Sequence, residues 1–144
     1  MAFHCRTPES REEPMSELSV EQKLSYIRNR KIGDCRRCRL HEDRTRIVFG
    51  KGNPEAKIMV VGEAPGMHED QKGEPFVGKA GEVLDSLLKA AGLSLDDVYI
   101  TNVVKCRPFE ADNPKKDRKP TPEEMAACRP FFDRQLELLD PKAM

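Results

Sequence analysis

Four cysteines have the residue type and the spacing that could bind a metal centre. Cys35 and Cys38 have the C-x-x-C spacing that lets two sulfurs bind one centre, and Cys106 and Cys128 lie far along the sequence. Four thiolates suit either a tetrahedral zinc ion or an iron–sulfur cluster, and their spacing alone does not separate the two. The alternative for Cys106 and Cys128 is that they are ordinary buried cysteines. The fifth cysteine, Cys5, is expected to be a bystander.

Basic residues gather around these cysteines. An arginine follows every cysteine of the chain: Arg6, Arg36, Arg39, Arg107 and Arg129. A centre with four thiolates carries excess negative charge, which nearby guanidinium groups would offset. The chain as a whole has 25 Lys+Arg and 25 Asp+Glu, a formal net charge of zero, which argues against a uniformly basic nucleic-acid binder. Because residues 28–46 and 105–119 are locally basic, we expect a DNA-facing surface near the cysteines.

The composition predicts a single polar domain. The chain has 144 residues, of which 38% are hydrophobic and 35% charged, and a chain of this length usually folds as one unit. No run approaches the roughly 18 apolar residues of a membrane span, and the N-terminus lacks the apolar region of a signal peptide. With an odd number of cysteines as well, we expect a cytoplasmic protein with metal or redox chemistry rather than a disulfide framework.

A second group of residues that could do chemistry lies at the ends of two predicted strands, the first over 57–61 and the second over 98–104. The group comprises Gly62, Glu63, Glu69 and Asp70 in the loop after the first strand, Phe76 further along that loop, and Asn102 near the end of the second strand. Ligands bind at the carboxyl ends of strands in open α/β sheets, so we expect these residues to converge on one edge. The alternatives are a solvated acidic loop, an aromatic side chain that fills the core, and a structural amide.

The elements that must position these residues alternate between helix and strand, which is typical of an α/β fold with a parallel sheet. The predicted elements are helices over 19–32, 80–91 and 121–139 and strands over 47–49, 57–61 and 98–104. Ser19 with Gln22 and Thr121 with Glu124 fit capping boxes at two helix starts. The helix over 80–91 supplies the crossover that a parallel strand pair needs.

Three segments are predicted to lack regular structure. Residues 1–18 are polar and form a disordered arm, residues 62–78 form a long Gly/Pro-rich loop, and residues 107–120 form a charged loop without periodicity. Two good strands make a small sheet, and the chain ends where another strand would begin. We therefore expect residues 19–144 to be one domain that is truncated at its C-terminus.

Five motifs follow one another between residues 32 and 139. They are Cys35-x-x-Cys38, Gly62-Glu-Ala-Pro-Gly66 with Glu69-Asp70, Gly73-Glu-Pro-Phe-Val-Gly-Lys-Ala-Gly81, Thr101-Asn-Val-Val-Lys-Cys-Arg-Pro108, and Pro120-Thr-Pro-Glu-Glu-Met-Ala-Ala-Cys128. In this combination the chain resembles the type-4 (iron–sulfur) uracil-DNA glycosylases of bacteria and archaea. The resemblance implies a three-layer α/β/α fold with a central parallel sheet. It also implies a structural [4Fe–4S] cluster on Cys35, Cys38, Cys106 and Cys128.

The same resemblance implies hydrolysis of the bond between uracil and deoxyribose in single- or double-stranded DNA. The site residues that it implies are Gly62, Ala64, Phe76 and Asn102 for binding the base, and Glu63, then Glu69, for catalysis. A base inside a duplex must first be flipped into a pocket, where Phe76 would stack on it and Asn102 would hydrogen-bond its Watson–Crick edge. A carboxylate beside the sugar would stabilise the positive charge that develops there and hold the attacking water.

The chain departs from the family pattern in two respects. The family carries a His-Pro motif near its C-terminus, and this chain ends before it; neither His41 nor His68 matches the context of that motif. The segment between Cys106 and Cys128 is longer than is usual in the family, with residues 110–116 as an insertion. We therefore expect weak activity or none from this chain alone, and cleavage of uracil by an extended version.

A hypothesis of another class needs only the cysteines and a basic surface. On this hypothesis the protein is a non-catalytic zinc or iron–sulfur module that binds nucleic acid or a replication protein. The two hypotheses differ at Glu63 and Asn102, because only the enzyme depends on these side chains. For the enzyme, the expected partner is uracil-containing DNA, bound by a monomer without membrane contact.

Overall fold

The computed structural model describes residues 17–144, so that most of the arm predicted over residues 1–18 lies outside the described part. The α-helices are α1 (Val20–Tyr26), α2 (Met67–Lys72), α3 (Lys79–Ala90) and α4 (Pro122–Leu139). The strands are β1 (Lys51–Gly52), β2 (Ile58–Gly62), β3 (Val98–Asn102), β4 (Phe109–Glu110) and β5 (Asn113–Asp117). A π-helical turn, η2 (Ile27–Ile32), and two 3₁₀ turns, η3 (Arg39–Glu42) and η4 (Leu95–Asp97), complete the set.

The central sheet has three strands in the order β1-β3-β2. The predicted parallel pair is confirmed, since β2 and β3 run parallel and place Gly62 opposite Asn102. The edge strand expected over 47–49 instead forms at β1, which pairs antiparallel with β3, so the sheet is mixed rather than wholly parallel. Near the end of the chain, Met59 donates to the carbonyl of Ala143 at 2.9 Å, which adds a parallel bridge on the outer side of β2.

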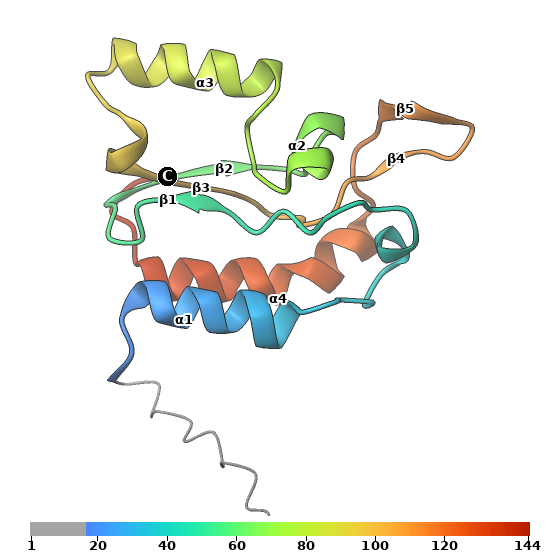
Figure 1. The fold of residues 1–144 in the computed structure, drawn as a ribbon, viewed down its shortest axis with the longest axis horizontal. Helices are drawn as coiled ribbons and strands as arrows, with labels where there is room; N and C mark the ends of the chain where they lie inside the picture. Colours follow the sequence, from blue (N-terminus) through green and yellow to red (C-terminus); the bar gives the residue numbers. More distant parts are fainter. Residues whose placement is uncertain (1–16) are drawn as a thin grey trace, which may run out of the picture.

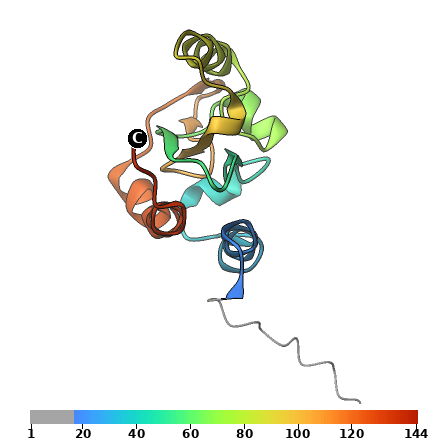
Figure 2. The ribbon, with the colours of Figure 1, turned by 90° about the vertical axis from the view of Figure 1, so that its left-hand side faces the viewer.

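Three layers are visible in Figure 1, with α3 on one face of the sheet and α4 with α1 on the other. Figure 2 shows the same arrangement along the sheet, with the coil of α3 at one side and those of α4 and α1 at the other. Leu88 of α3 packs with Val98 and Ile100 on the first face. The larger core lies on the second face, where Phe131 and Phe132 of α4 are buried. No helix in the described part is long and apolar enough to cross a membrane.

Both predicted capping boxes are present. Ser19 and Gln22 exchange backbone-to-side-chain hydrogen bonds at the start of α1, and Thr121 and Glu124 do the same at the start of α4. The first helix continues as η2 to Gly33, whose φ of 48° ends it, as the sequence predicted. Capping therefore fixes where the helices that carry the core side chains begin.

Two segments predicted as loops contain regular structure. Residues 62–78 include the short helix α2, and residues 107–120 form the β4–β5 hairpin, which projects from the body of the molecule in Figure 1. All five residues of β5 are exposed, so the strand needs no apolar face. Its sequence therefore lacks the alternating apolar pattern that predicts a strand. Polar contacts hold it instead: Arg107 donates to Asp117 at 2.6 Å, and Arg118 donates to the carbonyl of Phe109 at 3.1 Å.

The apolar face predicted for α3 is only partly buried. Leu88 is buried and Leu84 packs against the same cluster, but Val83 and Leu87 remain 60% and 61% exposed. The helix therefore rests on the sheet along a narrower stripe than its sequence pattern indicates.

Candidate functional site

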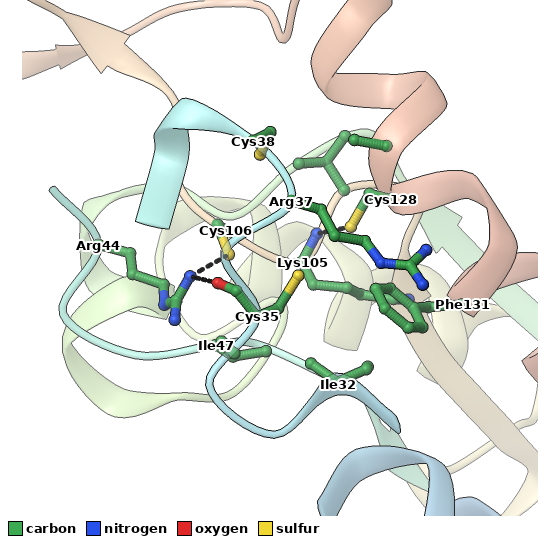
Figure 3. Close-up of a pocket in the computed structure, with 12 residues that line it drawn as sticks. Ile32, Cys35, Arg37, Cys38, Arg44, Ile47, Lys105, Cys106, Cys128 and Phe131 are labelled. Carbon is green, nitrogen blue, oxygen red and sulfur yellow. Dashed lines mark hydrogen bonds between the residues drawn. The ribbon is translucent and has the colours of Figure 1, made fainter. Parts of the chain in front are cut away.

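The four predicted cysteine ligands line one small cavity between the loop after η2, the end of β3 and helix α4 (Figure 3). Cys35, Cys38, Cys106 and Cys128 are all free thiols; the last two are buried and the first two partly exposed. Within residues 17–144, no three His, Cys, Asp or Glu side chains gather closely enough to hold a single metal ion. The chemistry of the cavity wall nevertheless suits a soft-metal cluster, because the described residues that line it include four thiols and no carboxylate or imidazole.

An arginine that sequence reasoning missed contacts two of these cysteines. The side chain of Arg44 is 8% exposed, and its Nη1 donates to the carbonyl of Cys35 at 2.6 Å and to Cys106 Sγ at 3.7 Å. Its Nη2 donates to Asp34 at 2.6 Å, so the guanidinium is held on both sides. The arginine that follows Cys106 in sequence, Arg107, bonds Asp117 of the hairpin instead. Positive charge at the sulfurs therefore comes from Arg44, which is distant from Cys106 in sequence, as well as from Arg37, which lies between Cys35 and Cys38 and also lines the cavity.

The thiols on the inner side of the cavity are held neutral by their surroundings. Burial raises the pKa of Cys106 to about 12, and the nearby Arg44 lowers it only in part. Burial also raises the pKa of Cys128, although the backbone N–H of Lys105 donates to its Sγ at 3.2 Å. Because the thiolate is the form that binds a metal, a metal centre held by these thiols would displace their protons.

A buried lysine links this cavity to the sheet. The Nζ of Lys105 donates to Thr101 Oγ1 at 2.7 Å, to the carbonyl of Asn102 at 2.6 Å and to Gln135 Oε1. Burial lowers the pKa of Lys105 to about 7, although the nearby Cys128 raises it. Gln135 and Thr101 also donate to the carbonyl of Phe49, at 3.0 Å and 2.7 Å. This network fixes the end of β3 against α4, and no sequence motif signalled it.

The predicted base-binding residues converge at the carboxyl ends of β2 and β3. A Cβ added to Gly62 would lie 2.1 Å from Asn102 Oδ1 and 3.0 Å from two ring atoms of Phe76, so only glycine fits between them. Asn102 is 4% exposed, and its side chain makes no hydrogen bond to any described residue. Because no fully buried side-chain N or O atom among residues 17–144 lacks a partner, the amide of Asn102 keeps access to solvent. Phe76 has a φ of 53°, an uncommon conformation for a residue with a bulky side chain, and its carbonyl lies against Gly81.

The ring of Phe76 is placed both to fill the core and to contact a ligand at the strand ends. It is partly buried and packs against the cluster of Leu88, Val98 and Ile100, as a residue that fills the core would. Its outer ring edge faces Gly62 and the Asn102 amide. The strained backbone at Phe76 therefore holds the edge of an aromatic ring near the Asn102 amide.

The candidate carboxylates lie in different environments. Glu63 is exposed immediately after β2, and its carbonyl accepts from Val104 N at 3.0 Å. Glu69 is buried on α2, where its carboxylate lies beside Gly66. Asp70 has a structural role: its Oδ1 accepts from the backbone N–H groups of Thr45, at 2.9 Å, and Arg46, at 3.4 Å. Of the three, only Glu63 presents its side chain to solvent.

The remaining loop residues close the site from two sides. Ala64 is partly buried and packs against the large core, so its backbone is fixed relative to β2. Asp117 of the hairpin approaches from the other side, since a Cβ on Gly66 would lie 2.9 Å from its Oδ2. The β4–β5 hairpin thus lies beside the loop that follows β2.

The chain is similar to known proteins over most of its length. Residues 49–144 match the model of the Uracil DNA glycosylase superfamily. The chain is 50% identical over 115 residues to a type-4 uracil-DNA glycosylase of Archaeoglobus fulgidus, covering 80% of this chain and 55% of the relative. It is 46% identical over 124 residues to a type-4 uracil-DNA glycosylase of Thermotoga maritima, covering 86% of this chain and 62% of the relative.

The matched region contains the sheet edge but only part of the cysteine cavity, since it includes Cys106 and Cys128 and begins after Cys35 and Cys38. The alignments with the type-4 relatives cover most of the chain. The chain spans between about half and three-fifths of the length of these curated relatives. The chain belongs to the uracil DNA glycosylase superfamily.

Proposed function

We propose that this protein excises uracil from DNA by hydrolysing the bond between the base and deoxyribose. One observation carries the proposal: Gly62, Phe76 and Asn102 converge at the carboxyl ends of two parallel strands. A flipped base needs an aromatic face for stacking and a polar group that reads its Watson–Crick edge, and these are the two functions that Phe76 and Asn102 offer. Because the base must come close to the strand end, the absence of a side chain at Gly62 is required.

Asn102 supports a preference for uracil over cytosine. Its side-chain amide has both an acceptor and two donors, and in the described part of the chain it has no partner of its own. Uracil and cytosine differ in donor pattern at N3 and at the C4 substituent. A buried amide oriented for one pattern discriminates strongly against the other, because a mismatched base leaves polar groups unpaired.

Glu63 is the carboxylate best placed for the reaction. Cleavage builds positive charge on the sugar and negative charge on the departing base, and a carboxylate beside the sugar stabilises the former and orients a water molecule. Glu63 follows β2 directly and faces solvent, where DNA can reach it. Glu69, the second candidate, is buried beside Gly66 and is better suited to shaping the loop.

We infer that Cys35, Cys38, Cys106 and Cys128 hold a [4Fe–4S] cluster. Each thiolate of such a cluster binds its own iron, so four sulfurs can share a cavity without gathering around one point, which agrees with their spread around the cavity wall. The cluster would supply a structural cross-link. It would join the segment after η2 to the end of β3 and to α4, and so support Asn102 through Lys105.

Uracil-containing and thymine-containing oligonucleotides, single- and double-stranded, test the function when both binding and excision are followed. Glu63→Gln is expected to lower excision by about two to three powers of ten with little effect on binding. Phe76→Ala and Asn102→Asp are each expected to weaken binding of the uracil-containing strand selectively. For Phe76→Ala the expected loss is about 1–3 kcal/mol, because stacking of the base on the ring is lost. Glu82→Gln, an exposed carboxylate on α3, is the matched control.

The cluster and the enzyme class are tested by separate measurements. Anaerobic purification is expected to give a brown protein that absorbs near about 400 nm, whereas a zinc protein is colourless. Cys128→Ser is expected to lose the colour and Cys5→Ser to keep it. A protein that keeps its fold and colour, binds DNA without preference for uracil and is unaffected by Glu63→Gln would instead be the non-catalytic binding module. We expect the protein to be a cytoplasmic monomer.

A further inference from the structure

A second cavity, separate from the cysteines, is lined by positive charge. Its cations come from four different parts of the chain: η2, the segment after η3, strand β1 and the end of α2. The lining residues are Arg28, Arg46, Lys51 and Lys72 together with Ile47, Gly50, Gly73 and Glu74. Four cations and a single carboxylate give this cavity a formal charge of +3 in a chain whose net charge is zero.

Little within residues 17–144 neutralises these cations. In this part of the chain Lys51 and Glu74 form the one ion pair of the cavity, at the long distance of 4.0 Å. Arg28, Arg46 and Lys72 have no ion pair with any residue of the described part. Like charges that converge without carboxylate partners repel one another, and an external anion relieves this repulsion.

Tertiary contacts hold the wall of this cavity together. The buried carboxylate of Asp70 accepts hydrogen bonds from the backbone N–H groups of Thr45 and Arg46, and so ties the segment that carries Arg46 to α2, which carries Lys72. Helix α2 ends at Gly73 with a φ of 75°, and a Cβ there would lie 3.3 Å from the Cδ of Arg46. The stem of Arg46 therefore lies across the end of α2.

This cavity adjoins the proposed uracil site. Gly73 in its wall and Phe76 at the base-binding position are three residues apart, so the chain separates their Cα atoms by at most about 11 Å. Lys51 pairs with Ile100 in the sheet, two residues before Asn102. Both the loop and the sheet thus connect the cations to the base-binding residues.

We propose that this cavity, which we call the four-cation pocket (Arg28, Arg46, Lys51 and Lys72), binds a backbone phosphate of the DNA strand that carries the flipped uracil. The proposal rests on the proposed function and adds a second point of contact to it. A phosphodiester carries one negative charge and two acceptor oxygens, which suit a guanidinium fork together with an ammonium. A phosphate held here fixes the strand while the base occupies the site at Phe76 and Asn102.

The salt dependence of DNA binding measures this contact directly. Each phosphate contact contributes a slope of about 0.7 for single-stranded DNA to the plot of log K against log salt concentration. Arg46→Gln with Lys72→Gln is expected to lower the slope by about 0.7, and at 0.1 M salt to weaken binding about fivefold. Because the pocket contacts the backbone, uracil- and thymine-containing strands are expected to lose the same factor.

Lys89→Gln is the matched control, since it removes one exposed cation from the last turn of α3, outside the pocket. Circular dichroism verifies that the variants are folded. An unchanged slope in the double variant overturns the pocket, even if uracil is still preferred. If the wild-type protein shows no preference for uracil, the proposed function is overturned instead. In that case a reduced salt slope of the double variant with both strands still supports the pocket. If inorganic phosphate binds to and stabilises the wild-type protein but the double variant keeps the wild-type salt slope of DNA binding, the pocket is an anion site that DNA does not use. This outcome overturns the proposal.

Discussion

The ammonium group of Lys105 donates a 2.6 Å hydrogen bond to the backbone carbonyl of Asn102. The backbone N–H of the same lysine donates to Cys128 Sγ at 3.2 Å. One buried residue therefore contacts both the strand end that carries Asn102 and the cavity that contains the thiols. A change at the cysteines can reach Asn102 through this single residue, by way of its backbone N–H and its side chain.

Replacement of this lysine is expected to destabilise the fold and to impair base binding together. Lys105→Met keeps the apolar stem but leaves the carbonyl of Asn102 without its donor, and the cost is expected to be about 1–3 kcal/mol in the free energy of unfolding. Urea titration measures this difference. Lys89→Met, at an exposed position, is expected to stay within about 0.5 kcal/mol of the wild type. Equal effects of the two substitutions would contradict a supporting role for the network.

A methyl group at Gly62 is expected to disrupt the proposed base-binding site. In Gly62→Ala the new Cβ would meet Asn102 Oδ1 at 2.1 Å and the Phe76 ring at 3.0 Å, so both side chains must move. A displacement of this size is expected to lower excision by about a hundredfold. Gly92→Ala is the control: its φ of 73° strains the backbone, but the new Cβ would have nothing within 4 Å. This control should lose stability and keep its excision rate per folded molecule.

The ion pair at the start of α4 is expected to make stability depend on acidic pH. Arg118 donates to both carboxylate oxygens of Glu124, at 2.7 Å and 2.9 Å, and this hydrogen bonding lowers the pKa of Glu124. A lowered pKa in the folded state stabilises the fold above the unfolded-state value of 4.5, and this stabilisation is lost as pH falls through the folded-state value.

Glu124→Gln tests this pH dependence. The variant is expected to be about 2 kcal/mol less stable at neutral pH, and the two stabilities should converge below pH 4.5. Unfolding measured between pH 7 and pH 3 gives the difference. Glu137→Gln breaks an exposed pair with Arg134 and is expected to have little effect at any pH. A constant difference across the range would show that Glu124 acts through packing alone.

The parts of the fold that depend on local chemistry could be predicted from the sequence. The capping boxes at Ser19 and Thr121, the glycine that ends the first helix and the parallel pair around the crossover helix all involve contacts between close neighbours or long apolar runs. The meeting of Gly62 with Asn102 followed from a general rule, since the carboxyl ends of parallel neighbours lie at one edge.

Features that depend on tertiary contacts could not be predicted in this way. The β4–β5 hairpin has no apolar alternation, because Arg107 and Arg118 hold it through polar groups. Lys105 lies in a segment that looks like any strand end, and its burial becomes clear only when α4 places Gln135 opposite it. Arg44 is nine residues from Cys35 in sequence, and no local pattern links the two residues. The sequence therefore indicated the arginines next to each cysteine and not Arg44.

Arg44 is expected to control how firmly the proposed cluster is held. Its guanidinium joins the carbonyl of Cys35 to Cys106 Sγ and offsets negative charge on the sulfurs, so Arg44→Gln loosens the ligands and removes that charge. We expect less iron per folded chain and faster bleaching in air of the absorbance near about 400 nm. Arg36→Gln is the matched control, because Arg36 also pairs with Asp34 but is 72% exposed and makes no hydrogen bond to a cysteine within residues 17–144. Equal iron content and equal bleaching rates in the two variants would leave Arg44 with no role beyond its contact with Asp34.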